Sequence, residues 1–151
     1  MTIEFVKTCE DAKKCNQLLT KLIQSERRFN CNIKEEYKVE EWFENIVNDK
    51  SNIIIVAKED DLIVGYLFCK IITVDDDPTL ESEALIDGLY VEDEFRNKGI
   101  ATKLIEAAKK WCREQNVKYI NINVFDENSI ALNLYYKMGF KDLERKLRLG
   151  L

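Results

Sequence analysis

Apolar and polar residues alternate in several short segments of this 151-residue chain, and such alternation predicts β-strands. Alternation marks 3–7 and 119–125, the β-branched run 53–57 predicts a further strand, and 62–74 and 83–91 are predicted as two more. A looser alternation over 140–149 predicts one or two final strands. Asp60 and Asp61 predict the turn between 53–57 and 62–74, and the run Asp-Asp-Asp-Pro at 75–78 is expected to end the strand 62–74.

Apolar residues three or four positions apart predict helices between these strands. Thr8 is the expected N-cap of the first helix, with Asp11 three residues later and with Leu18 and Leu22 among its apolar positions. Further helices are predicted over 34–47, 99–115 and 129–138, the last of them ended by Gly139. The order β-α-α-β-β-β-α-β-α-β predicts a single mixed α/β domain over residues 1–151.

Composition and charge argue against several classes of protein. A hydrophobic content of 46% and a charged content of 34% are typical of a globular chain. There is no apolar run long enough for a transmembrane helix, and the first residues lack the features of a signal peptide, which predicts a cytoplasmic protein without membrane contact. The net charge of −5 argues against nucleic acid as a partner.

The histidine and cysteine content limits the available chemistry. The chain has no histidine, so Ser-His and Cys-His nucleophilic machinery is excluded and the usual metal sites are not expected. Its five cysteines show no C-x-x-C spacing and read as small core residues, so no metal is predicted. Acid–base chemistry must therefore come from Asp, Glu, Tyr, Lys, Cys or water.

Residues 96–101 (Arg-Asn-Lys-Gly-Ile-Ala) combine the features that a pyrophosphate needs. They join a predicted strand to a predicted helix, so free backbone N–H groups are available at the helix start, and Gly99 allows close approach. Without an anion, Arg96 and Lys98 would each oppose the helix dipole by about 0.3–1 kcal/mol. The segment is neither a Walker A loop nor a G-x-G-x-x-G turn.

Two motifs together resemble the GCN5-related N-acetyltransferase (GNAT) superfamily. Arg96-x-x-Gly99-x-Ala101 resembles the family's acetyl-CoA signature, Q/R-x-x-G-x-G/A, and residues 128–140 are similar to its pattern N-x-x-A-x-x-L-Y-x-x-x-G-F. The resemblance implies a mostly antiparallel central sheet with a splayed pair of central strands. It also implies transfer of an acetyl group from acetyl-CoA to a primary amine, by direct attack in a ternary complex. A non-catalytic acyl-CoA-binding or sensing module on the same fold is the alternative.

The resemblance further implies which residues hold the cofactor. Leu89 and Val91 would hydrogen-bond the pantetheine arm through their backbone, and the Val91 N–H would polarise the thioester carbonyl. The pyrophosphate would be held by consecutive N–H groups, those of Asn97, Lys98, Gly99, Ile100, Ala101 and Thr102.

Tyr135 is the predicted general acid. Asn128, Ala131 and Tyr135 are spaced i, i+3 and i+7, so they share one helix face. Asn128 could bond cofactor amides, and Ala131 leaves room for the cofactor. With a reference pKa of about 10, Tyr135 can donate a proton to the departing thiolate, although a packed core tyrosine is the plainer interpretation.

Asp87 is the predicted general base. It alternates with Leu89 and Val91, so the three side chains are expected on one face of the sheet. By resemblance, a carboxylate at this position takes the proton of the amine, directly or through water. Glu83 and water alone remain alternatives, and so does a purely structural strand-end or bulge role for Asp87.

The acceptor amine, of a small molecule or a peptide, is expected between the first two helices and the central strands. Trp42 and Phe43 are expected in the core or the pocket wall. Five glutamates of the second helix could attract a cationic amine, although a solvated face is the simpler interpretation: Glu35, Glu36, Glu40, Glu41 and Glu44. A homodimer formed through the last strand, 141–149, is a further hypothesis.

Overall fold

The computed structural model describes residues 1–72 and 79–151. The predicted end of the strand 62–74, at the Asp-Asp-Asp-Pro run 75–78, lies outside the described residues. The elements, in order, are β1 (Thr2–Phe5), α1 (Cys9–Ser25), the 3-10 turn η1 (Glu26–Arg28), α2 (Trp42–Ile46), β2 (Asn52–Glu59), β3 (Leu62–Ile72), β4 (Glu83–Val91), the 3-10 turn η2 (Asp93–Phe95), α3 (Ile100–Glu114), β5 (Tyr119–Ile122) and α4 (Ser129–Lys137). None of the helices described is long and apolar enough to cross a membrane.

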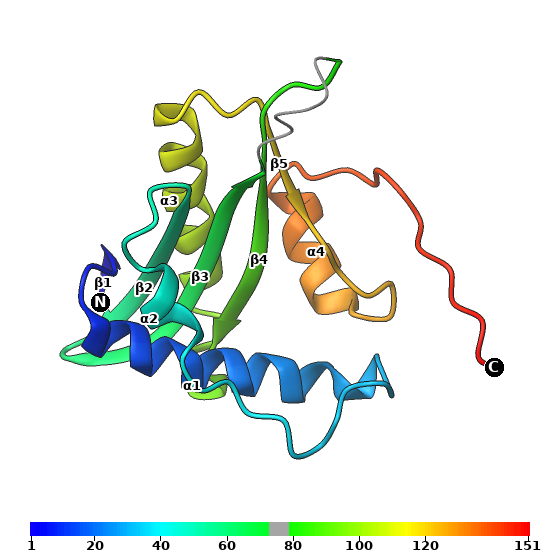
Figure 1. Ribbon diagram of the computed structural model, residues 1–151, viewed down its shortest axis with the longest axis horizontal. Coiled ribbons are helices and arrows are strands. Elements are labelled where there is room, and N and C mark those ends of the chain that lie inside the picture. Colours follow the sequence, from blue (N-terminus) through cyan, green and yellow to red (C-terminus); the bar gives the residue numbers. More distant parts are fainter. Residues whose placement is uncertain (73–78) are drawn as a thin grey trace.

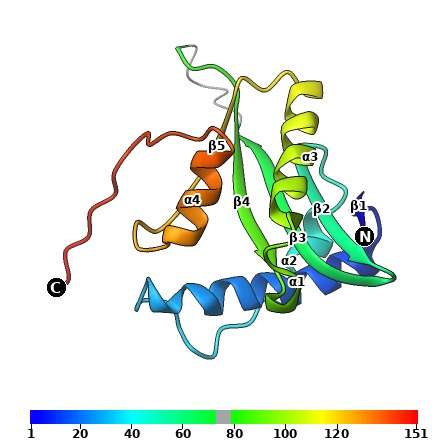
Figure 2. The same cartoon turned by 180° about the vertical axis from the view of Figure 1, so that it is seen from behind.

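The described strands form one sheet in the order β1-β2-β3-β4-β5. The first three pairings are antiparallel, and β4 pairs with β5 in parallel. Helices α1 and α2 lie on one face of the sheet and α3 lies on the other, while α4 stands beside β5 (Figures 1 and 2). This arrangement confirms the predicted α/β class and the mostly antiparallel sheet.

Strand β4 and the edge strand β5 separate partway along β4. Their pairing joins Glu83–Ile86 to Tyr119–Ile122, whereas the rest of β4, up to Val91, has no pairing with β5 (Figure 1). On its other edge, the Glu92 N–H donates to the Val64 carbonyl at 2.9 Å. Because donors alternate along an antiparallel ladder, the backbone N–H and C=O groups of Leu89 and Val91 point away from β3, toward the gap. The splayed pair that the family resemblance implies is present.

A hydrophobic core fills each face of the sheet. The core on the α3 face contains residues of β2, β3 and β4 together with Leu104, Ile105 and Ala108, and it extends to Tyr135 of α4. The core on the α1 face joins Ala12, Cys15 and Leu18 to Phe43 of α2 and to the other sides of the same strands. Of the cysteines, Cys15, Cys69 and Cys112 are buried as small core residues.

The local end signals of the helices are confirmed. The Asp11 N–H donates to the Thr8 hydroxyl at 3.2 Å, which makes Thr8 the N-cap of α1. Gly139 follows the last residues of α4 with a φ of +93°, the left-handed conformation that glycine adopts without strain.

The predicted helix 34–47 is wrong over most of its length, because only Trp42–Ile46 is helical. The cause is a stripe of polar side chains on α1, at Asn16, Thr20 and Gln24, that binds the backbone of residues 34–43 in a non-helical path. Gln24 donates to the carbonyls of Lys34 and Tyr37, Thr20 accepts from the Val39 N–H, and Asn16 donates to the Glu40 carbonyl. Backbone groups that a helix would pair internally are satisfied by tertiary contacts instead.

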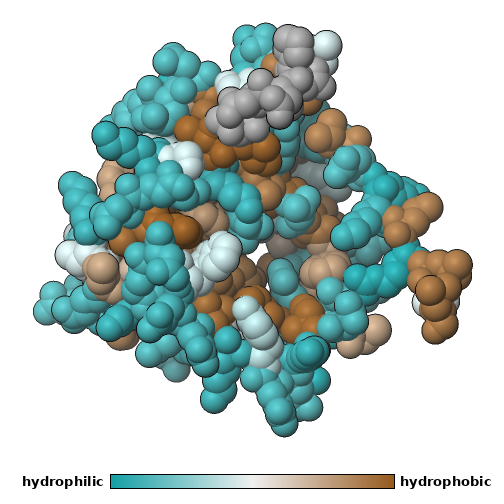
Figure 3. Space-filling view, in the orientation of Figure 1, coloured by the Kyte–Doolittle hydropathy of each residue, from teal (hydrophilic) through white to brown (hydrophobic). Residues whose placement is uncertain are grey.

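The predicted strand over 140–149 is also wrong, because residues 140–151 form no strand in the described structure. A strand needs a partner edge, and this segment runs away from the sheet (Figures 1 and 3). Leu143, Leu147 and Leu149 are 78%, 84% and 83% exposed, so their apolar surface is not covered by the fold. Dimerisation through this segment stays a prediction, which light scattering can test.

Candidate active site

The segment after β4 leads to a helix start whose first N–H groups are open. Gly99 is the N-cap of α3 with a φ of +74°, and Asn97 also has a positive φ of +60°. No side chain of the described residues caps this helix, so the N–H groups of Ile100, Ala101 and Thr102 in its first turn are left for a ligand. A Cβ on Gly99 would meet no described atom within 4 Å, so the space beside it is open.

The Arg96 side chain binds back onto the end of β4. Its Nε donates to the Val91 carbonyl at 2.9 Å, and its guanidinium pairs with Asp93 at 2.8 Å. The ammonium of Lys98 lies 4.9 Å from the centre of the Phe95 ring. Arg96 therefore fastens the loop to the strand. It also occupies the Val91 carbonyl, which leaves the Val91 N–H as the group of that residue available to a ligand in the gap.

Helix α4 places Tyr135 against the same core as the end of β4. The Asn128 side-chain oxygen accepts from the Ala131 N–H at 3.2 Å and so caps the helix. Tyr135 is 9% exposed and belongs to the buried cluster that contains Val91 and Ile100, with Leu89, Ala101 and Ala131 packed against it. Burial raises the pKa of Tyr135 to about 12, so its hydroxyl keeps its proton at neutral pH.

A β-bulge changes the predicted position of Asp87. The β3–β4 register passes from Phe68–Gly88 to Cys69–Ile86, so Asp87 is the extra, unpaired residue. Leu89 packs on the α3-face core, whereas Asp87 lines a cavity on the α1 face. The expectation that Asp87 shares a face with Leu89 and Val91 is therefore wrong, because the bulge interrupts the alternation between them.

Gly88 and Lys70 shape the surroundings of Asp87. A Cβ on Gly88 would lie 2.7 Å from the Tyr66 hydroxyl, so the bulge requires glycine at this position. The Lys70 ammonium pairs with the Asp87 carboxylate at 2.7 Å, and both side chains are partly exposed. The carboxylate thus already has one cationic partner at the edge of the cavity.

The predicted acid and base lie on opposite faces of the sheet. Tyr135 belongs to the α3-face core, and Asp87 opens to the α1 face. The gap between β4 and β5 lies next to both, since it begins after Ile86. A thioester placed in the gap can thus receive an amine from one face and release its thiolate on the other.

Two further residues of this region were missed from the sequence. The Tyr66 hydroxyl is buried without a hydrogen-bond partner among the described residues, and burial raises its pKa. Burial also raises the pKa of Glu26, which follows α1 directly. After burial, Cys15 and then Glu26 contribute to the raised pKa of Tyr66, and Glu26 contributes to that of Tyr135. Neither residue belongs to a motif that could have indicated it.

The segment that follows α1 and η1 contacts the segment that precedes α4. The Phe29 and Phe125 rings stack with centroids 6.0 Å apart, just after η1 and just before α4. Glu26 is the first residue of η1, three positions before Phe29. Segments distant in sequence therefore meet around the candidate site.

Comparisons with known proteins agree with this geometry. The model of the acetyltransferase (GNAT) family matches residues 17–140. A spermidine N(1)-acetyltransferase of Thermoplasma acidophilum is 30% identical over 122 residues, which cover 79% of this chain and 71% of that protein. An N-alpha-acetyltransferase of Sulfurisphaera tokodaii is 33% identical over 94 residues, 59% of this chain and 56% of that protein.

Solved structures share the whole fold. The BH1408 protein of Bacillus halodurans, in a mutant form, superposes with a TM-score of 0.87 at 20% identity, covering 100% of this chain and 99% of that one. An aminoglycoside N-acetyltransferase in complex with CoA gives a TM-score of 0.70 at 18% identity, covering 99% and 98%. The chain therefore belongs to the GNAT acetyltransferase family, the acyl-CoA-dependent N-acyltransferases.

Proposed function

We propose that this protein transfers an acetyl group from acetyl-CoA to the primary amine of a small molecule or peptide, by direct attack in a ternary complex. The observation that carries the proposal is the open edge of β4, which is followed, after η2 and a short loop, by the uncapped N-terminus of α3. Relatives named for spermidine and for N-alpha-acetylation are consistent with an amine acceptor.

The cofactor would lie along this edge. The N–H groups from Asn97 to Thr102 would hold the pyrophosphate, and the backbone of Leu89 and Val91 would pair with the amide-rich pantetheine arm as an added strand does. The Val91 N–H would donate to the thioester carbonyl oxygen as charge develops on it. Ala131 leaves space beside the arm, and the side-chain amide of Asn128 faces it from the start of α4.

Two proton transfers complete the reaction. An alkylammonium with a pKa of about 10.4 is neutral in only about one molecule in 10³ at pH 7, so a base must take its proton. Asp87, directly or through water, takes it, and the freed amine attacks the thioester carbon. The carbon–sulfur bond breaks, and Tyr135 gives its proton to the departing thiolate of coenzyme A.

Gly99→Ala tests the cofactor site. We expect calorimetric titration to show at least a tenfold loss of acetyl-CoA affinity, because the Cβ enters the space open to the ligand. The loss of stability should be small, about 1–2 kcal/mol, for one alanine in the left-handed region. Gly150→Ala is the matched control, since a Cβ there also meets nothing within 4 Å. Undiminished affinity in Gly99→Ala would contradict the placement of the pyrophosphate.

Release of the coenzyme A thiol tests the transfer itself. An enzyme releases thiol in the presence of an accepted amine, whereas the alternative, a non-catalytic acyl-CoA-binding or sensing module, binds acetyl-CoA and releases none with any amine. Polyamines, aminoglycosides, amino acids, arylalkylamines and peptides with free N-termini form the panel. Acetyl-CoA binding without release across this panel would favour the sensing module.

Asp87→Asn tests the base. We expect kcat/KM at pH 7 to fall about 10²-fold, with a deficit that shrinks as the pH approaches the pKa of the amine, because a neutral amine needs no base. Glu83→Gln, on the same strand, is the comparison and should change kcat/KM little. A loss confined to Glu26→Gln would instead assign the proton to the Glu26 carboxylate, whose pKa is raised by partial burial.

A further inference from the structure

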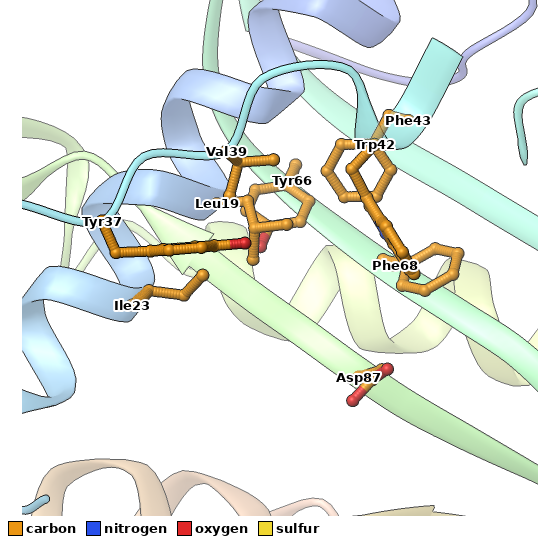
Figure 4. A pocket seen from close by; sticks show the side chains of 9 residues that line it. All are labelled: Leu19, Ile23, Tyr37, Val39, Trp42, Phe43, Tyr66, Phe68 and Asp87. Carbon is orange, nitrogen blue, oxygen red and sulfur yellow. The ribbon is translucent and has the colours of Figure 1, made fainter. Parts of the chain in front are cut away.

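A cavity of about 240 Å³ lies on the α1 face of the sheet, beside the bulge of β4 (Figure 4). Apart from Asp87, the residues described around it are aliphatic or aromatic, among them Leu19, Tyr37, Trp42 and Phe68. An apolar cavity of about 150 Å³ is enough to hold benzene. This one therefore has room for a single ring and a short chain that carries an amine.

The charges around the cavity do not suit a polycation. The glutamates at 35–44 do not line it; Glu35 pairs with Arg27, and Glu44 accepts from Asn16. The carboxylate that does line it, Asp87, is paired with Lys70 at 2.7 Å. Each further ammonium of a polyamine or aminoglycoside would be placed against apolar side chains without a partner, which is costly.

The apolar wall of the cavity includes aromatic rings that the fold leaves uncovered. Tyr37 and Trp42 are each 51% exposed, although both line the cavity. Figure 4 shows Asp87 on β4, apart from the aliphatic and aromatic side chains that form the rest of the lining. A ligand with one polar end and one apolar end would bury these rings and place its polar end at the bulge.

An unsatisfied polar group lies at the same end as Asp87. The Tyr66 hydroxyl is buried, has no partner among the described residues, and lies against Gly88, the neighbour of Asp87. A buried hydroxyl without a partner is costly, so a polar ligand atom at the bulge would be stabilised there. The Tyr66 hydroxyl and Asp87 therefore both lie at the bulge of β4.

We propose that the acceptor is a primary monoamine that carries one ring-sized apolar group, with its nitrogen at Asp87 and its apolar group against Tyr37 and Trp42. This inference rests on the proposed function. The same chemistry occurs in a free arylalkylamine and in a peptide whose first residue has a large apolar side chain. Polyamines and aminoglycosides lack the apolar group and carry the extra charges.

The acceptor class is tested by thiol release at saturating acetyl-CoA. We expect 2-phenylethylamine or the tetrapeptide Phe-Ala-Ala-Ala to exceed spermidine and kanamycin at least tenfold in kcat/KM, because apolar contacts in a pocket discriminate by such factors. Comparison of 2-phenylethylamine with Phe-Ala-Ala-Ala shows whether the acceptor is a free amine or a peptide N-terminus. Comparison of Phe-Ala-Ala-Ala with Ser-Ala-Ala-Ala shows whether a peptide acceptor needs the apolar first side chain. Spermidine or kanamycin equal to or better than the ring-bearing amines would overturn the inference and leave acetyl transfer standing.

Trp42→Ala tests the site of the ring. We expect the preference for 2-phenylethylamine over propylamine to fall about tenfold, since Trp42 contacts the ring and not the amine. Leu62→Ala is the matched control, because Leu62 is 61% exposed and does not line the cavity. Tyr37→Ala is a second variant at the same wall. Unchanged preference in both wall variants would overturn the placement.

A binding measurement separates this inference from the proposed function. The chain has two tryptophans, so in a Trp111→Phe background the emission reports on Trp42 alone. We expect 2-phenylethylamine to change this emission saturably and spermidine to leave it unchanged, with or without turnover. Saturable binding without thiol release would defeat the proposed reaction but support the ligand class. No response to the ring-bearing amine would overturn the ligand class.

Discussion

Replacing Tyr135 by Phe should lower kcat about 10²–10⁴-fold, the range of a lost general acid. Acetyl-CoA affinity should stay within about threefold, because the ring and its edge contact with Phe140 are kept and only the hydroxyl is removed. The wild-type rate should show no loss attributable to Tyr135 up to pH 10, since its pKa is raised to about 12 and the proton is retained below that value. Thiol-release rates and calorimetric titration measure the two quantities.

Tyr136→Phe is the matched control for this variant. Tyr136 is the next residue of α4, but it is 47% exposed and its hydroxyl donates to Asp142 at 2.7 Å. Its replacement should change kcat by less than twofold. Equal turnover of wild type and Tyr135→Phe would return Tyr135 to the plain role of a packed core aromatic.

Replacing Asn16 by Ala should lower the free energy of unfolding by about 2–4 kcal/mol, the cost of breaking a buried hydrogen-bond network. Asn16 is 3% exposed. Its side chain donates to the Glu40 carbonyl and to Glu44, and it accepts from the Phe43 N–H. Thermal unfolding should shift by about 5–15 °C, given the usual entropy of a domain of this size.

Asn45→Ala is the control for the Asn16 substitution. Asn45 lies on α2, is exposed, and donates to the Glu41 carbonyl within its own segment, so its loss should cost under about 0.5 kcal/mol.

Because residues 34–43 also form a wall of the cavity, Asn16→Ala should raise the KM for the acceptor more than that for acetyl-CoA. Unfolding temperatures within 2 °C of each other in wild type and Asn16→Ala would show that the network does not hold this segment.

The parts of the site that were predicted from the sequence are those built from neighbouring residues. The glycine at the junction of strand and helix, the open start of α3 and the placement of Tyr135 inward on α4 follow from spacing over a few positions. Helix caps such as Thr8 follow in the same way. Local backbone geometry and side-chain periodicity determine these features, and both can be read from a short window.

The missed parts depend on partners that are distant in the sequence. The position of Asp87 was wrong because the bulge is set by the pairing of β4 with β3 and by the Tyr66 hydroxyl against Gly88. The helix predicted over 34–47 was shortened by Asn16, Thr20 and Gln24, which are 10 to 28 positions away from the groups they bind. Alternation within a segment carries no information about either contact.

Short-range periodicity and turn chemistry in the chain specified the family, most of the strands and helices, and the open start of α3. Packing between separate segments set the face that Asp87 occupies and formed the apolar cavity on the α1 face. The physical reason is that strand register, bulges and cavities arise where separate segments pack together, so their positions are fixed by contacts that no single segment contains.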